Sequence, residues 1–301
     1  MKKKTKTISA TLLFLVSLLI FSKPAFAQDA ISLSISPPIF EIMIMPGKEY
    51  KTEFNISNQS GSTILTPKIV VFTPKDEFGN VTLTSIPAPQ WVKYNPNSFS
   101  LDSGNSKSFS VLFSPPKDTA EIDYYLSLVF ETDSPTDLLV DNSSLYTAKI
   151  ASNILLSVNL DGNPIKSAEI VQFNAPIIAD SFFGKLNYSI VLKNTGNSFW
   201  KPIGKILLGE NGALNLAPQN VISGYTRNIT CINNENLIPC TLDKKPFLGK
   251  VDAVLEFSID EDPQIYNQKT TTFVFPFSLT IVLVLSFFVL LLTRRRRRRH
   301  S

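Results

Sequence analysis

Short stretches in which apolar and polar residues alternate recur along most of the chain, from Asp29 to Thr272. Ile31 to Ile35 alternates at every position, and Tyr50 to Ser57 does so again. Proline, glycine, asparagine and aspartate separate the stretches, as at Pro46-Gly47. Because a period of two puts alternate side chains on one face of a strand, the pattern predicts half-buried strands joined by turns, with almost no helix.

The predicted strands form two series. The first comprises Ile31–Ile35, Ile39–Met45, Tyr50–Ser57, Ile64–Thr73, Ser106–Phe113, Tyr124–Glu131 and Leu145–Leu160. The second comprises Lys166–Phe173, Lys185–Lys193, Lys201–Leu208, Tyr225–Cys231 and Lys250–Ile259. Between them, Asp161-Gly162-Asn163-Pro164 has the composition of a turn and marks a domain boundary.

A single strand cannot bury its apolar face, but two sheets packed ~10 Å apart can. The sequence therefore predicts an all-β protein with two tandem Ig-like β-sandwich domains, residues 28–161 and 162–269. In both halves an alternating strand ends in asparagine and glycine, at 55–61 and at 193–197, where such residues cap their own backbone. We expect Gln268 to Thr272 to form a short stalk.

The first 27 residues have the three parts of a secretory signal peptide. Lys2, Lys3, Lys4 and Lys6 precede a short apolar run from Ile8 to Phe21. Ala25 and Ala27 then fit the two small positions of a cleavage site, which would leave Gln28 as the first residue. An uncleaved membrane anchor is the alternative.

A second apolar run, Phe273 to Thr293, is followed by arginines at Arg294, Arg295, Arg296, Arg297, Arg298 and Arg299. As a helix, the run is long enough to cross ~30 Å of hydrocarbon. Arginine marks the cytoplasmic side, so we predict a single-pass transmembrane helix at 273–293, a stop-transfer signal and basic cytoplasmic tail at 294–301, and an N-terminus outside. The arginines could instead be a nucleic-acid patch, but they lie directly against the apolar run. No sortase motif precedes the run, so we expect the helix to be retained.

These two ends place the bulk of the chain outside the cytoplasmic membrane, at the cell surface, and they change its apparent charge. The whole chain carries a formal charge of +4. Without the five lysines of the leader and the six arginines of the tail, 18 basic residues remain against 25 acidic ones, a net charge of −7. An acidic exported region argues against nucleic acid or anionic lipid as a partner.

The two cysteines, Cys231 and Cys240, lie in the exported region, where disulfides persist. The residues between them are polar and typical of turns, so the chain can fold back and join the sulfurs. We predict a disulfide worth ~2–3 kcal/mol by loop entropy. Two free thiols are the alternative, and without a histidine nearby the pair cannot complete a zinc site.

Residues with catalytic chemistry are few in the exported region. The one histidine, His300, lies in the predicted cytoplasmic tail, which excludes an exported Ser-His-Asp or Cys-His site. A glycosidase needs two paired carboxylates, and nothing selects two among 25 acidic residues. The sequence therefore predicts a protein that is not an enzyme, with no cofactor and no metal. A carbohydrate-active enzyme is the remote alternative.

Two segments are rich in acidic residues, and the first offers candidate ligands for a cation. Oxygen ligands for calcium could come from Glu131, Asp133, Asp137, Asp141 and Asn142, but they lack the spacing of a calcium loop. A solvated loop is the favoured interpretation. Asp260-Glu261-Asp262 is likewise expected to be a solvated charge run near the membrane.

Aromatic residues beside prolines are the candidates for surface contact. Trp91 and Tyr94 follow Pro89, and Phe199-Trp200 precedes Pro202. Each pair could be a platform on which a sugar ring stacks, or it could fill a core or an edge. We favour packing and keep Trp91, Tyr94 and Trp200 as candidate contacts.

The segment Ile35-Ser36-Pro37-Pro38-Ile39-Phe40-Glu41, followed by Pro46-Gly47 and Phe54-Asn55-Ile56-Ser57-Asn58, resembles the N-terminal domain of bacterial WxL-interacting cell-surface proteins. The order of leader, two Ig-like domains, C-terminal helix and basic tail is similar too. Pilus-assembly chaperones and major-sperm-protein-like sandwiches share a weaker form of the motif. The resemblance implies contact with peptidoglycan by the first domain and with protein by the second. It carries over no binding residue.

The expected function is that of a non-enzymatic, membrane-anchored adaptor that binds a cell-wall polymer or a partner surface protein. Strand addition at an exposed sheet edge is one way in which it could bind. The alternative is a chaperone-like factor for envelope or pilus assembly that holds other exported chains. The predicted anchor counts against this alternative, because pilus chaperones are normally soluble in the periplasm.

Overall fold

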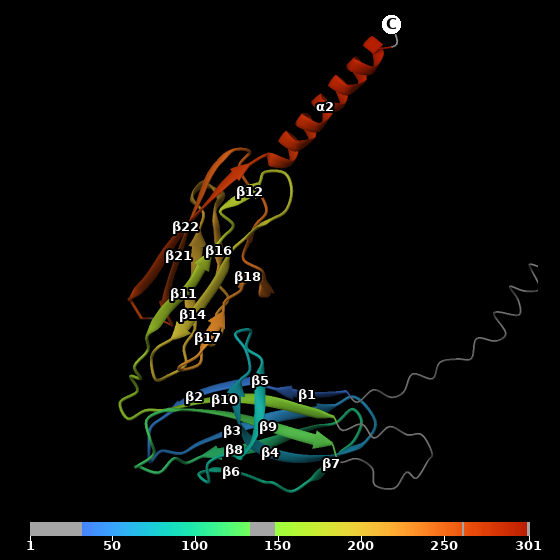
Figure 1. The fold of residues 1–301 in the computed structure, drawn as a ribbon. Helices are drawn as coiled ribbons and strands as arrows, with labels where there is room; N and C mark the ends of the chain where they lie inside the picture. Colours follow the sequence, from blue (N-terminus) through green and yellow to red (C-terminus); the bar gives the residue numbers. More distant parts are fainter. Residues whose placement is uncertain (1–31, 133–147, 261, 300–301) are drawn as a thin grey trace, which may run out of the picture.

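The computed structural model describes residues 32–132, 148–260 and 262–299, and in it two β-sandwiches precede one helix (Figure 1). The predicted fold class, all-β with two tandem Ig-like sandwiches and one C-terminal apolar helix, is confirmed. The leader with Ala25 and Ala27 lies outside the described residues, as do Asp133, Asp137, Asp141 and Asn142.

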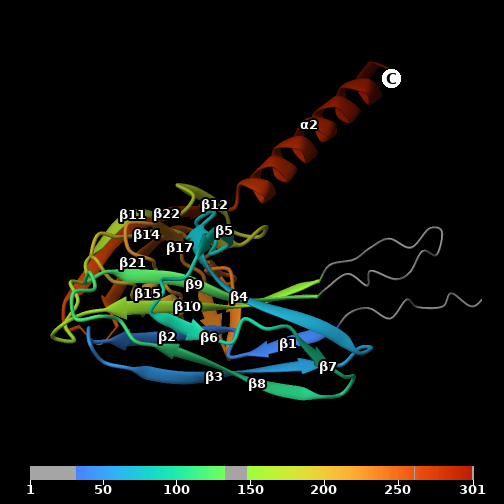
Figure 2. The ribbon, with the colours of Figure 1, turned by 90° about the horizontal axis from the view of Figure 1, so that it is seen from below.

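The first domain consists of two antiparallel layers, which Figure 2 shows one above the other. One sheet has the order β1-β3-β8-β6, and the other has the order β2-β10-β9-β4-β5 with β7 beside β4. Among the described strands of this domain, β2 and β10 are the one pair that runs in parallel. The strands are β1 Leu33–Ser36, β2 Ile39–Ile44, β3 Tyr50–Asn58, β4 Thr63–Pro74, β5 Val81–Pro87, β6 Val92–Tyr94, β7 Phe99–Leu101, β8 Ser106–Phe113, β9 Asp123–Thr132 and β10 Lys149–Val158.

The second domain packs a three-stranded sheet, β11-β14-β17, against a five-stranded sheet, β12-β22-β21-β15-β16. Two short pairs, β13 with β20 and β18 with β19, complete it. The elements are β11 Ala168–Asn174, β12 Ile178–Asp180, β13 Leu186–Asn187, β14 Ser189–Asn194, β15 Pro202–Leu207, the 3-10 helix η1 Gly209–Asn211, β16 Ala213–Asn215, β17 Thr226–Asn228, β18 Cys231–Asn233, β19 Asn236–Ile238, β20 Thr241–Leu242, β21 Gly249–Ile259 and β22 Ile265–Phe275.

Each sandwich has its own apolar core, built from the alternation seen along the chain. In β3, Phe54 and Ile56 are fully buried, whereas Glu53 and Asn55 between and beside them are exposed. The core of the second domain is centred on Trp200, whose ring stacks on Phe257 at a centroid distance of 6.4 Å. Two separate cores explain why the chain forms two domains: each sandwich buries its own apolar faces.

A buried asparagine ends one alternating strand in each domain. The side-chain amide of Asn58 donates to the carbonyls of Gly61 and Leu101 at 2.9 Å. The amide of Asn194 donates to the carbonyls of Ser198 and Val221 at 2.8 Å. Its oxygen accepts from the N–H of Gly196. The capping expected at both turns is therefore present, and it satisfies main-chain groups that burial would otherwise leave without partners.

The stalk expected at Gln268 to Thr272 is wrong. These residues belong to β22, which pairs with β21 along ten positions and continues to Phe275. The three threonines at 270–272 are β-branched and suit a strand. The helix α2, Phe277–Arg299, begins after Pro276 alone, so Phe273 and Phe275 of the apolar run lie on the strand. The second sandwich therefore passes directly into the helix.

The second sandwich stands on one side of the first: its strands run steeply upward, whereas those of the first domain run across the view, and the helix extends from the far end of the second (Figure 1). The linker runs from the end of β10 to the start of β11 and contains Asp161 to Pro164. The hairpin of β4 and β5 rises from the first domain toward the second (Figure 1). Within the described residues, α2 is the one helix long and apolar enough to cross a membrane, over Phe277–Arg295.

Candidate functional site between the two domains

A cavity of about 420 Å³ lies between the two domains, and we call it the interdomain cleft. The first domain lines it with residues of β2, β4, β5 and β10. The second lines it with the loop 217–222 and parts of β17, β18 and β19. Its lining residues include Ile39, Glu41, Phe72, Leu155, Lys201 and Asn220. A smaller cavity of about 280 Å³ lies on the other side of Glu41, against Met43 and Lys166. The lining mixes apolar, amide and charged side chains.

The strand β2 borders both cavities and is an edge of its sheet. Among the described residues, β10 is its one strand partner. The carbonyls of Pro38 and Ile44 accept from N–H groups beside or within β10, those of Asn153 and Asn159. Main-chain groups alternate direction along a strand, so those of Ile39, Glu41 and Met43 point to the open side.

Glu41 joins the two domains. One of its carboxylate oxygens accepts from Nζ of Lys201 at 2.6 Å, and the other accepts from the side-chain amide of Asn220 at 2.5 Å. The Oδ1 atom of Asn220 is buried and has no hydrogen-bond partner in the described structure. An acceptor without a partner beside a cavity is suited to receive an N–H from a ligand.

Asp123 and Tyr125, both on β9, form a second contact between the domains. The Asp123 carboxylate accepts from the Tyr125 hydroxyl at 2.7 Å and from the N–H of Phe199 at 2.6 Å. The Tyr125 hydroxyl in turn accepts from the N–H of Ser223 at 3.0 Å. Burial raises the pKa of Asp123 above its ordinary value, although these hydrogen bonds act in the opposite direction. Burial and the neighbouring Asp123 carboxylate raise the pKa of Tyr125.

The tip of the β4–β5 hairpin forms a third contact. The carbonyl of Glu77 accepts from the N–H of Asn228 on β17 at 2.7 Å. The Glu77 carboxylate accepts from the hydroxyl of Thr226 at 2.8 Å. Gly79, with φ of 88°, lets the guanidinium of Arg227 lie against the backbone of the tip. The tip thus occupies the position of a neighbouring strand on the open edge of β17.

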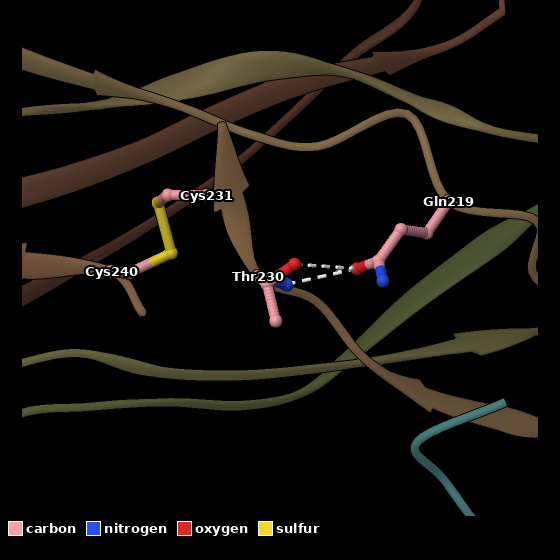
Figure 3. Close-up of a disulfide and its surroundings, with 4 residues drawn as sticks. All are labelled: Gln219, Thr230, Cys231 and Cys240. Carbon is pink, nitrogen blue, oxygen red and sulfur yellow. Dashed lines mark hydrogen bonds between the residues drawn. A yellow bond between two sulfur atoms is a disulfide. The ribbon is translucent and has the colours of Figure 1, made fainter. Parts of the chain in front are cut away.

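The disulfide predicted between Cys231 and Cys240 is present and supports the wall of the cleft (Figure 3). The adjoining Thr230 donates its N–H to Oε1 of Gln219 at 3.0 Å and its hydroxyl to the same atom at 3.1 Å. Gln219 is in the lining loop, and Leu237 of the disulfide hairpin lines the cleft too. The crosslink therefore closes a hairpin that contributes Ile232 and Leu237 to the lining of the cleft.

The aromatic candidates pack inside the domains. Trp200 is 1% exposed, and its indole N–H donates to the carbonyl of Ser167, so it cannot stack on a surface ligand. Trp91 is partly buried, with its ring edge-to-face on Tyr124 at 5.1 Å. Tyr94 is also partly buried, and its hydroxyl accepts from the N–H of Ile69. The packing interpretation therefore accounts for all three side chains.

The expectation for Asp260 is wrong in both environment and place. Its carboxylate accepts from Nζ of Lys166 at 2.6 Å and from the N–H of Lys201 at 3.0 Å. Since β21 and β22 form a hairpin, their connecting turn lies at the opposite end from Phe275 and the helix. Lys201 is also the partner of Glu41, so Asp260 faces the first domain. Proximity in sequence to the helix was a misleading signal.

The cleft is suited to binding. Among the described residues, no group of three or more histidine, cysteine, aspartate or glutamate side chains is placed to hold a metal ion. Glu131, a candidate calcium ligand in the sequence, instead pairs with Lys149 at 2.7 Å and Lys68 at 2.5 Å, and these ammonium groups lower the pKa of its carboxyl.

The sequence alone did not indicate Glu41, Asp123 and Asn220 as site residues, because each acts through a contact with the other domain.

No family model and no curated protein matches the chain. Solved structures of similar fold include a chain of the Salmonella enterica SafA pilin complex with the SafB chaperone, with TM-score 0.42 and 9% identity, covering 81% of this chain and 99% of that one. The E. coli chaperone DraB has TM-score 0.40 and 10% identity, covering 81% and 97%. The class 5 fimbriae chaperone CfaA has TM-score 0.39 and 15% identity, covering 79% and 99%. These values assign no function or site residue. The resemblance to WxL-interacting proteins stays a prediction.

Proposed function

We propose that this protein is a membrane-anchored binding protein of the cell surface, and that its first domain takes an extended segment of a partner protein along the open edge of β2. The observation that supports the proposal is the direction of the main-chain groups of Ile39, Glu41 and Met43. They point away from β10 at the border of two cavities. An added strand would satisfy them.

Side chains of the added strand would find different surroundings along β2. Next to Ile39 lies the larger cavity, lined also by Leu155 and Phe72. Next to Met43 lies the smaller cavity, with Lys166 and Asp260 in its wall. Main-chain pairing would supply affinity, and these cavities would select the side chains of the partner.

A protein partner accounts for the site better than a polysaccharide does. Sugar recognition commonly uses exposed aromatic faces, but Trp200 is in the core and Trp91 packs on Tyr124. The open edge of β2 presents main-chain groups, which match another extended main chain and not the face of a sugar ring. One stable surface partner would make the protein an adaptor, and many transient exported partners would make it an assembly factor. We propose the adaptor.

The test places a photo-crosslinking amino acid at Met43 of the full chain in intact cells, with the same substitution at the exposed Ile86 of β5 as control. We expect one recurring crosslinked protein from position 43 and none from position 86. Many different nascent exported chains at position 43 would replace the adaptor with an assembly factor. Equal labelling from both positions would contradict binding at β2.

A matched pair of variants tests the strand-addition geometry. Met43→Pro removes an N–H that points to the open side, whereas Met43→Ala removes the side chain alone. We expect Met43→Pro to weaken partner capture by roughly three- to tenfold relative to Met43→Ala, since a main-chain hydrogen bond contributes ~0.5–1.5 kcal/mol. Equal capture by the two variants would contradict main-chain pairing.

A further inference from the structure

An exposed apolar surface surrounds the start of α2 at the end of the second domain. Two loops, 181–184 and 244–248, project there beside β12 and β22. Phe182, Phe183, Phe247 and Leu248 in these loops are 56%, 71%, 59% and 56% exposed, and Ile177 before β12 is 82% exposed. We call these five residues the aromatic collar. Clustered apolar side chains of this size are unusual on a surface in water.

The collar is built as a fixed part of the domain. The rings of Phe182 and Phe247 pack edge-to-face with centroids 5.7 Å apart, which joins the two loops. The ammonium group of Lys245 donates to the carbonyls of Asp180, Phe183 and Gly184. The apolar side chains are therefore held outward while the polar groups of the loop are satisfied within it.

One carboxylate holds the collar at the level of the helix. An oxygen of Asp180 accepts from the N–H of Phe182 at 2.8 Å and from that of Phe183 at 2.9 Å. Its other oxygen accepts from the N–H of Ser278 in the first turn of α2, at 2.8 Å. Burial disfavours the charged form, but these N–H groups outweigh it and hold the pKa of Asp180 well below its ordinary value. The loop cannot move far from the helix start while this carboxylate bridges them.

The same apolar surface continues onto the sheet. Ile178 of β12 is in register with Phe273 of β22, and such partners share one face of a sheet. Ile178 is 60% exposed and Phe273 is 41% exposed. Phe275, two positions along, points to the same face immediately before the helix. Collar and strand thus form one apolar surface that leads into α2.

The length of the span places this surface at the bilayer. From Phe277 to Thr293 the helix rises about 26 Å at ~1.5 Å per residue, whereas the hydrocarbon is ~30 Å thick. With Arg294 at the inner boundary, the outer boundary reaches Phe277 or slightly beyond it, and any tilt of the helix moves it farther. The collar lies at this level, because β12 ends beside the helix base (Figure 1) and its last residue, Asp180, bonds the N–H of Ser278.

We infer that the aromatic collar inserts into the outer boundary of the same bilayer that α2 crosses, so that the second domain rests directly on the membrane and the cleft is held in a fixed orientation. This inference rests on the membrane span of the proposed function. Moving phenylalanine and isoleucine side chains out of water lowers the free energy. The outer boundary of the bilayer can take them up without ordering a partner protein. The exposed Lys244, in the same loop as Phe247, can stay among the headgroups.

The test uses the full chain in phosphatidylcholine vesicles that contain lipids brominated at shallow or deep acyl positions, which quench tryptophan by contact. Tryptophan replaces Phe183 or Phe247 in the collar, Leu285 in mid-span, or Ile86 on the first domain, and the emission of the unsubstituted chain is subtracted. We expect shallow bromine to quench Phe183→Trp and Phe247→Trp at least half as strongly as deep bromine quenches Leu285→Trp, and to leave Ile86→Trp unchanged.

The other outcomes separate the two proposals. Quenching of Leu285→Trp with neither collar position above Ile86→Trp would overturn the collar inference and leave the span intact. No quenching at Leu285→Trp would remove the span, and the collar inference with it. Collar emission that shifts to the blue with protein concentration, but is not quenched by lipid, would assign the surface to a second copy of the chain and overturn the inference.

Discussion

Two buried asparagines do the same work in the two domains. Asn58 and Asn194 are each fully buried, and each bonds main-chain groups on two sides of its turn. A side-chain amide has two donors and one acceptor, so one residue replaces several main-chain partners that a sharp turn cannot supply. Replacing such a residue lowers the free energy of unfolding, because its former hydrogen-bond partners stay buried.

Asn194→Ala tests this cost. It would remove the partner of the Ser198 carbonyl and of the Gly196 N–H, and one of two donors to the Val221 carbonyl, which keeps the N–H of Trp200. We expect the free energy of unfolding to fall by about 2–4 kcal/mol, measured by chemical denaturation. The control is Asn174→Ala, which truncates an exposed asparagine at the end of β11 and should cost less than ~0.5 kcal/mol. Similar costs for both variants would contradict the role of the buried amide.

The β4–β5 hairpin is the element that couples the domains. Its tip bonds β17 through the carbonyl of Glu77 and packs against Arg227 at Gly79. A Cβ at Gly79 would lie 1.7 Å from Nη1 of Arg227, whereas a Cβ at Gly104 would meet no atom within 4 Å. Both glycines have positive φ, so the two positions differ chiefly in the contact with the second domain.

Gly79→Val is therefore expected to undock the hairpin, and Gly104→Val is not. Both variants pay the cost of the left-handed conformation, about 1–2 kcal/mol. Only Gly79→Val also displaces Arg227, so we expect faster proteolysis of the linker 159–167 in membranes that carry this variant. Cleavage sites are identified by mass spectrometry. Equal linker cleavage in the two variants would mean that the hairpin does not hold the domains together.

At the scale of the whole molecule, three acidic residues of the first domain bond the second where the domains meet. Asp123, Glu41 and Glu77 of the first domain bond Phe199, Lys201 and Thr226 of the second. Of these acidic groups, Asp123 has a raised pKa because it is buried. An aspartate with a raised folded pKa adds stability that is complete below its unfolded pKa of ~3.9 and is lost as the pH rises through the folded pKa.

Comparison of the unsubstituted protein with Asp123→Asn isolates this dependence. The amide keeps an oxygen that can accept from Tyr125 and Phe199 but has no charge to bury. We expect the stability of the unsubstituted protein relative to the variant to increase as the pH is lowered from 7 to about 4, measured by thermal unfolding. The other carboxyl groups of the described residues, which do not contact Asp123, are expected to titrate alike in both proteins. Parallel pH curves would show that the Asp123 charge is not penalised by burial.

Local patterns along the chain were sufficient for the architecture. The alternation in β3 and β21 predicted these strands correctly, and the asparagine and glycine residues after Asn58 and Asn194 predicted the turns. Both signals depend on neighbours within a few residues. The disulfide was predictable because its loop closes by itself. The apolar helix was predictable from composition and length, although its first residues belong to β22.

Contacts between distant segments were decided by tertiary structure alone. Glu41 and Lys201 are 160 residues apart, and nothing near either residue in sequence indicates their pairing. The hairpin of β21 and β22 turned Asp260 away from the helix, and the carboxylate of Asp180 brought the collar to the helix, 98 residues along the chain. Periodicity reports which side of a strand is buried, but it contains no information on which surface covers that side. The cleft and the collar therefore emerged only when the two sandwiches and the helix were placed together.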